Sequence, residues 1–124
     1  GMQMPERMLD QVNATPEQRT QIKQIMQAAA TDMKAQHESG RALRDQAMQL
    51  FTQPNVDANA VEGLRQKMLS QHDQTSKRMM QAMLDSSKVL TPEQRLKLAD
   101  MQKQRRDMME RHQRERSAMP APKS

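Results

Sequence analysis

Three histidines, His37, His72 and His112, are the side chains of this 124-residue chain best suited to hold a metal ion. Zinc is usually bound by four ligands, with imidazole joined by carboxylates or thiolates, and the chain has no cysteine. Met108 and His112 are four residues apart, which places both on one helix face and suits a softer metal such as copper. Because these ligand sets are thin, neither a metal nor another cofactor is expected, and the four residues remain candidate ligands.

The sequence contains little that could carry out catalysis. Ser39-Gly40 and Ser86-Ser87 lie in long helical runs, with no sequence cue to a neighbouring general base. A glycine-rich phosphate loop is missing, and no cysteine can act as a nucleophile. The chain is therefore not expected to be an enzyme.

The formal charge of +5 is confined to the end of the chain, because residues 1–94 are balanced. Nine basic and four acidic residues fall within 95–124. Aromatic side chains for base stacking are missing from this stretch, so nucleic-acid binding is not expected. The basic residues that such binding would need are Lys103, Arg105, Arg106, Arg111, Arg114 and Arg116.

The composition favours helices with a thin apolar seam. Leu, Ile, Val and Phe together make up only 16 of 124 residues, and Phe51 is the only aromatic residue. Such a low share of bulky apolar residues often indicates disorder. Here 14 methionines, scarce glycine and few prolines favour helix instead. Apolar runs are too short to cross a bilayer, so no spanning segment is expected.

Turn signals divide the chain into four predicted helices, at about 5–12, 16–51, 58–88 and 92–116. Asp57 is placed to cap the third. Residues 117–124 read as a disordered tail, and 1–116 as one domain. The chain begins Gly1-Met2, which suggests a residue left by tag cleavage, so a signal peptide is expected to have preceded Met2 and been removed.

A five-residue segment occurs twice, 76 residues apart, and marks two helix starts. Thr is the N-cap, Pro occupies the first helical position, Glu complements the helix dipole, and Gln bonds back to the cap. The repeated residues are Thr15, Pro16, Glu17, Gln18 and Arg19, then Thr91, Pro92, Glu93, Gln94 and Arg95.

Apolar residues at three- and four-residue spacing predict a long helical hairpin that turns near Pro54. Its paired residue numbers are expected to sum to about 109, which places Gly40 near Met68 and His37 opposite His72. The apolar stripe becomes polar in the middle of both helices, and these gaps should coincide. One hairpin cannot cover both of its faces, so a homodimer is expected.

The duplicated Thr-x-x-Gln, in a small chain rich in Gln and Met, resembles the LTXXQ-motif family, which includes Spy/CpxP-like periplasmic chaperones and related metal-resistance and sensor proteins. Leu90 completes the second motif, whereas Ala14 replaces the leucine before the first. The resemblance covers roughly residues 5–116. It implies a periplasmic protein, a cradle-like antiparallel homodimer, and ATP-independent binding of unfolded or misfolded proteins during envelope stress. In one branch it implies contact with an envelope sensor kinase, and in another the binding of zinc, copper or nickel.

A chaperone of this kind needs an adaptable, weakly apolar surface rimmed with charge, and methionine supplies such a surface. The chain is accordingly expected to bind clients through methionines and nearby cations. The candidate residues are Met33, Arg41, Arg44, Met48, Arg65, Met68, Lys77, Arg78, Met79, Met80 and Met83.

Overall fold

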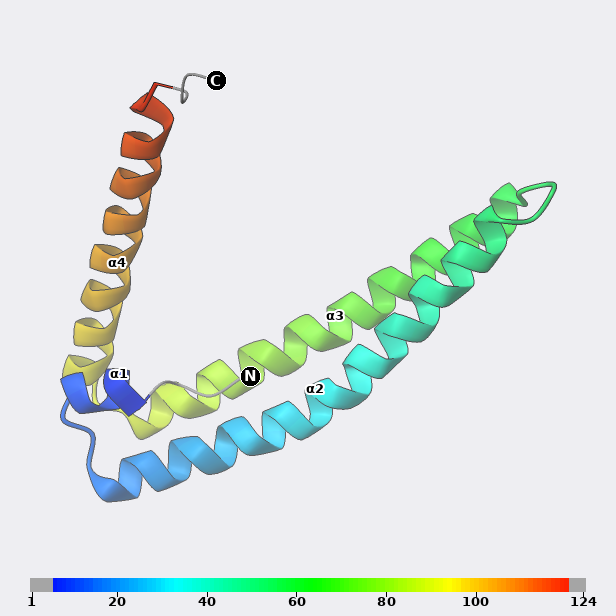
Figure 1. The fold of residues 1–124 in the computed structure, drawn as a ribbon. Helices are drawn as coiled ribbons and strands as arrows, with labels where there is room; N and C mark the ends of the chain where they lie inside the picture. The colour runs from blue at the N-terminus through cyan, green and yellow to red at the C-terminus, as the bar shows by residue number, and fades with distance from the viewer. Residues whose placement is uncertain (1–5, 121–124) are drawn as a thin grey trace.

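The computed structural model describes residues 6–120, and within them the chain is all α-helical (Figure 1). It forms α1 (Glu6–Gln11), α2 (Pro16–Phe51), α3 (Ala58–Val89) and α4 (Pro92–Ala118). The predicted all-α, four-helix class is confirmed. Helix α4 includes Ser117 and Ala118, which the sequence placed in a tail. Pro5 of the first expected helix and residues 121–124 of the tail lie outside the described residues.

The turns between the helices follow from local side-chain chemistry. Asp57 caps α3, because its Oδ1 accepts hydrogen bonds from the backbone N–H groups of Asn59 at 2.9 Å and Ala60 at 3.3 Å. After α1 the chain reverses at Asn13, whose φ of 54° is left-handed, and asparagine tolerates that conformation better than most residues. Each connection is short, so consecutive helices are held close to one another.

The largest apolar core lies at one end of the molecule, where α1 meets the start of α2, the end of α3 and the start of α4 (Figure 1). Met8, Met26, Val89 and Met101 cover its edges. This cluster is therefore a corner that fixes the helix ends. Its buried residues are Leu9, Val12, Ala14, Ile22, Leu90 and Leu98. Further buried apolar residues lie along the hairpin, namely Ala29, Met33, Leu64 and Ala82.

Helices α2 and α3 lie side by side as a long hairpin, which at about 1.5 Å per residue extends for roughly 54 Å (Figure 1). The predicted polar gap in its seam is confirmed. Gln71 Nε2 donates to the Gln36 carbonyl at 2.8 Å, and Gln36 Nε2 reaches Gln74 Oε1 at 3.4 Å. Gly40 faces Gln71, whose amide nitrogen would lie 3.4 Å from a Cβ built on the glycine. The seam is thus narrow and partly polar.

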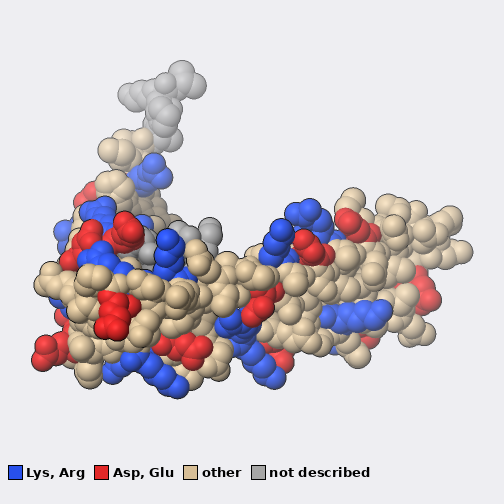
Figure 2. Space-filling model, turned by 90° about the horizontal axis from the view of Figure 1, so that it is seen from below, with Lys and Arg blue, Asp and Glu red and all other residues tan. Residues whose placement is uncertain are grey.

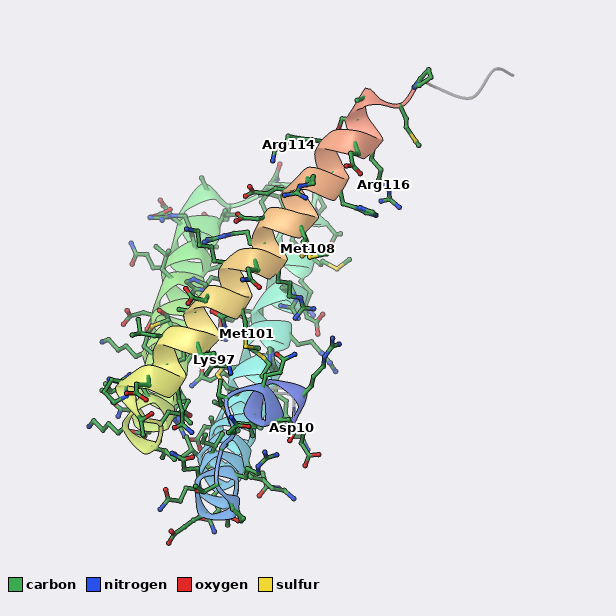
Figure 3. All side chains as sticks on the ribbon, turned by 90° about the vertical axis from the view of Figure 1, so that its left-hand side faces the viewer. Asp10, Lys97, Met101, Met108, Arg114 and Arg116 are labelled. Atoms are coloured by element: carbon green, nitrogen blue, oxygen red, sulfur yellow. The ribbon has the colours of Figure 1, made fainter. Side chains whose placement is uncertain are left out.

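Helix α4 leaves the corner at a steep angle to the hairpin (Figure 1). Leu98 is buried and Met101 half-buried, but every residue from Gln102 to Pro120 is exposed. Figure 3 shows Met108 farther along the helix than Met101, and Arg114 and Arg116 projecting to opposite sides near its end. Most of α4 is therefore an arm that packs on nothing else in residues 6–120.

Candidate functional site

The repeated Thr-x-x-Gln motif forms the two helix caps that the sequence predicts. Thr15 Oγ1 accepts from the Gln18 N–H at 3.1 Å, while Gln18 Oε1 accepts from the Thr15 N–H at 2.9 Å. Thr91 and Gln94 repeat this capping box, at 3.2 Å and 2.9 Å. Both motifs thus begin their helices with satisfied backbone donors.

The two glutamines also bind each other, which sequence reasoning missed. Gln18 Nε2 donates to Gln94 Oε1 at 2.9 Å, and Gln94 Nε2 donates to Gln18 Oε1 at 3.0 Å. The same amides reach the carbonyls of Val89 at 3.1 Å and Val12 at 3.3 Å. We call this pair the glutamine clasp. It joins the starts of α2 and α4, so the two motif glutamines position the helices.

The arginine that follows each motif has a similar structural role. Arg19 Nε donates to the Ala14 carbonyl at 3.0 Å, and its Nη1 lies 2.6 Å from Asp10 Oδ1. Arg95 Nη1 donates to the Ser87 carbonyl at 2.8 Å. These bonds hold the chain segments that enter α2 and α4.

Six exposed apolar residues lie on α3 in two groups, at 68–69 and 79–84, and we call them together the methionine stripe. The sequence predicts its four methionines, which are 39% to 56% exposed, as client-binding residues. It missed two leucines that extend the stripe and are 55% and 49% exposed. Single exposed apolar residues are common, but six on one helix form a surface that can bind another chain. The stripe consists of Met68, Leu69, Met79, Met80, Met83 and Leu84.

Helix α2 places cations beside the methionine stripe. Arg44 lines a groove of about 340 Å³ between α2 and α3, together with Met68, Leu69 and His72. Arg41 lies three residues before Arg44, and therefore on the same helix face. We call Arg41 and Arg44 the basic edge. Neither forms an ion pair within residues 6–120. Both are thus available to acidic groups of a bound chain.

Arg65 also lines this groove but is already paired. Its Nε donates to Glu62 Oε2 at 2.7 Å, and a second bond joins Nη2 to Glu62 Oε1. The hydrogen bond from Arg65 is the main reason that the Glu62 pKa is lowered from its ordinary value, and the pKa of Arg65 is raised by the same bond. Arg65 therefore presents a neutralised pair to the groove.

Three predicted client-binding residues, Met33, Lys77 and Arg78, do not line this groove. Met33 is only 5% exposed, because it packs in the hairpin seam. Arg78 crosses the seam to Asp32, with Nε 2.6 Å from Oδ2, on the hairpin edge opposite Arg44. Lys77 Nζ lies 3.1 Å from Asp73 Oδ2, and Lys77 precedes Met80 by about one turn of α3. None of the three faces the groove.

The tip of the hairpin carries a second exposed apolar group. Met48, a predicted client-binding residue, is 69% exposed, and Phe51 and Val56, near the same turn in the sequence, are 62% and 46% exposed. Met48 follows Arg44 by one helical turn, so this apolar group lies next to the basic edge. Figure 2 shows charged side chains of both signs over the hairpin, separated by broad uncharged areas.

The candidate metal ligands are spread over three helices. His37 lies on α2, His72 on α3, and Met108 with His112 on the exposed part of α4. His72 lines the groove beside Met68. Within residues 6–120 no three His, Asp or Glu side chains come close enough to hold one ion.

The fold and the paired caps define a small helical protein with two Thr-x-x-Gln helix starts. The family model described as the LTXXQ motif family protein matches residues 2–102, and the chain belongs to this family. Comparison with curated proteins and with solved structures gives no match. The family match ends at Gln102, so the remainder of α4 extends beyond it. None of the helices in residues 6–120 is long and apolar enough to cross a membrane.

Proposed function

We propose that this protein is an ATP-independent periplasmic chaperone, or an envelope-stress accessory protein, that binds unfolded or misfolded clients as a homodimer. The observation that carries the proposal is the methionine stripe, with six exposed apolar side chains on one helix. Membership of the LTXXQ motif family supports it, because the resemblance to that family implies a chaperone of this kind.

The chemistry of this surface suits binding without a fixed partner. Methionine is unbranched and polarisable, so it adapts to clients of different shape. Arg44 lines the groove beside Met68 and Leu69, and Arg41 lies one helical turn before it. Both can attract acidic segments of a client. Each apolar contact is individually weak and reversible, so we expect clients to bind and leave without a nucleotide.

The test measures how far this protein suppresses the aggregation of a reduced, unfolded model client such as α-lactalbumin. Aggregation is followed by light scattering. Wild-type protein should suppress scattering at near-equimolar ratio. The double variant Met79→Gln/Met83→Gln should suppress aggregation several-fold less well, because both methionines contribute apolar surface to the stripe. The matched control is Met108→Gln with Met109→Gln, on the α4 arm, where the exposed fractions are 68% and 66%.

The control pair should leave suppression nearly unchanged. Absence of suppression by the wild type at any ratio would contradict the chaperone proposal. An equal loss in both pairs would show that the stripe is not the binding surface. Analytical ultracentrifugation of the wild type tests the homodimer separately.

A further inference from the structure

The methionines of this chain fall into two groups that differ in exposure. Met33 is 5% exposed, and Met8, Met26 and Met101 are partly buried against the corner core. The sequence has no Cys, Trp or Tyr, so the thioethers are its most readily oxidised side chains. Eight described methionines, 39% to 73% exposed, are open to an oxidant in solution: Met48, Met68, Met79, Met80, Met83, Met108, Met109 and Met119.

We propose that Met79, Met80 and Met83 form an oxidation site that weakens client binding without unfolding the protein. The inference rests on the proposed function. The co-reactant is a two-electron oxidant such as hypochlorous acid. Each thioether gains one oxygen and becomes a sulfoxide, sulfur is oxidised by two electrons, and hypochlorous acid is reduced to chloride with release of one proton.

The three residues concentrate the effect in one part of the methionine stripe. They lie within five positions of α3, and Met83 is a helical neighbour of both Met79 and Met80. Of the apolar residues from 79 to 84 that are exposed, only Leu84 would remain apolar after oxidation. At the other end of the stripe, Leu69 keeps its apolar surface beside Met68. A sulfoxide is polar, so the Met79–Met83 region loses most of the surface that a client would cover.

The fold should survive oxidation, because the buried residues of the corner core contain no sulfur. The buried residues of the corner core are aliphatic, and the glutamine clasp above them consists of amides. Met33, the one buried methionine of the hairpin seam, is shielded by α3. Met79, Met80 and Met83 are not part of the corner core or the glutamine clasp, so their oxidation leaves those contacts in place.

The experiment treats the full chain with increasing molar ratios of hypochlorous acid and maps sulfoxides by peptide mass spectrometry. Circular dichroism reports the helices, and fluorescence anisotropy reports binding of a labelled unfolded client. We expect sulfoxide at Met79, Met80 and Met83 before Met33, unchanged helicity, and affinity weakened roughly tenfold or more. Methionine sulfoxide reductases A and B together should restore binding.

The decisive variant replaces the three methionines by leucine, which is similar in volume and helix propensity. Met79→Leu/Met80→Leu/Met83→Leu should bind as the untreated wild type does and keep its affinity after oxidation. The control Met108→Leu/Met109→Leu should remain as sensitive as the wild type. The inference would be overturned if the triple variant lost affinity on oxidation, or if oxidation of the wild type reduced its helicity. It would also be overturned if the wild type formed sulfoxide fully at the three methionines and kept its affinity. If the untreated wild type binds no client, the proposed function fails instead.

Discussion

The side-chain amides of Gln18 and Gln94 donate hydrogen bonds to each other, at 2.9 Å and 3.0 Å, across 76 residues of sequence. Each glutamine also completes the cap of its own helix. One residue type therefore does two tasks at both motifs: it satisfies a backbone donor locally and joins two helix starts. The mutual bond explains why both motifs contain glutamine, which two independent helix caps would not require.

The glutamine clasp should contribute strongly to stability. Gln94→Ala removes the bonds to Gln18, to the Val12 carbonyl and to the Thr91 N–H, so we expect unfolding to become easier by about 2–3 kcal/mol. Thermal denaturation followed by circular dichroism measures this. The control Gln104→Ala, on the exposed arm, should change stability by less than about 0.5 kcal/mol. Equal effects would contradict the clasp.

Ser86 should be replaceable with a gain in stability. Its side chain is 4% exposed, and its Oγ has no hydrogen-bond partner in the described structure. An unpaired buried hydroxyl is costly and alanine is the better helix former, so Ser86→Ala should stabilise by about 1 kcal/mol. Chemical denaturation measures the change. Ser76→Ala, at an exposed position on α3, should gain only the smaller helix-propensity part.

The two helical glycines should respond differently to alanine. At Gly63 an added Cβ meets no atom within 4 Å, so Gly63→Ala should stabilise by about 0.5–1 kcal/mol. At Gly40 the Cβ would lie 3.4 Å from the Gln71 amide nitrogen, which donates to Gln36. Gly40→Ala should therefore gain less than Gly63→Ala in the same denaturation assay. The reverse order would show that the Gln71 side chain yields freely.

The arm of α4 should be dispensable for folding. Its side chains beyond Met101 are exposed, so a chain ending at Gln102 loses no buried contact. We expect its free energy of unfolding to differ from that of the full chain by less than about 1 kcal/mol. Leu98→Ala in the full chain is the contrast, because it removes a buried side chain and should cost about 2–4 kcal/mol. A large loss on truncation would reveal packing of the arm on a second copy.

Glu62 should titrate below its ordinary pKa. Its carboxylate is stabilised by Arg65, so the folded pKa is lowered, and this pairing stabilises the helix above the unfolded pKa and is lost as pH falls through the folded value. Carboxyl chemical shifts measured by NMR between pH 2 and pH 7 give the midpoint. Arg65→Gln should raise it towards the ordinary value, whereas Lys77→Gln, which removes the partner of Asp73, should not move it.

Much of the fold follows from local sequence signals. Thr15 and Thr91 begin helices because their capping chemistry acts within three residues, and Asp57 caps α3 for the same reason. The polar gap was also predictable, since Gln36 and Gln71 interrupt apolar stripes at matching depth. These features need no knowledge of the tertiary structure beyond an antiparallel hairpin.

The surface was harder to predict, because helical spacing does not say which side of a stripe faces a neighbour. Met33 and Met68 have the same side chain, yet one packs in the seam and the other is 39% exposed. Arg78 was expected at the binding surface, but Asp32 draws it to the opposite edge. The clasp was missed because Gln18 and Gln94 are 76 residues apart and meet only in the folded chain. The carbonyls of Val89 and Val12, which also accept from these amides, are brought to them by the same folding.

The corner core also determines how the chain must fold. The hairpin can form from its Asp57 turn outward, since each new contact closes only a few more residues. The corner is different, because Leu9 and Ile22 must meet Leu90 and Leu98 across most of the sequence. Such long-range closure is slow relative to helix formation. The hairpin should therefore form before the corner, and amide hydrogen exchange should be slowest beside the clasp and fastest towards the free end of α4.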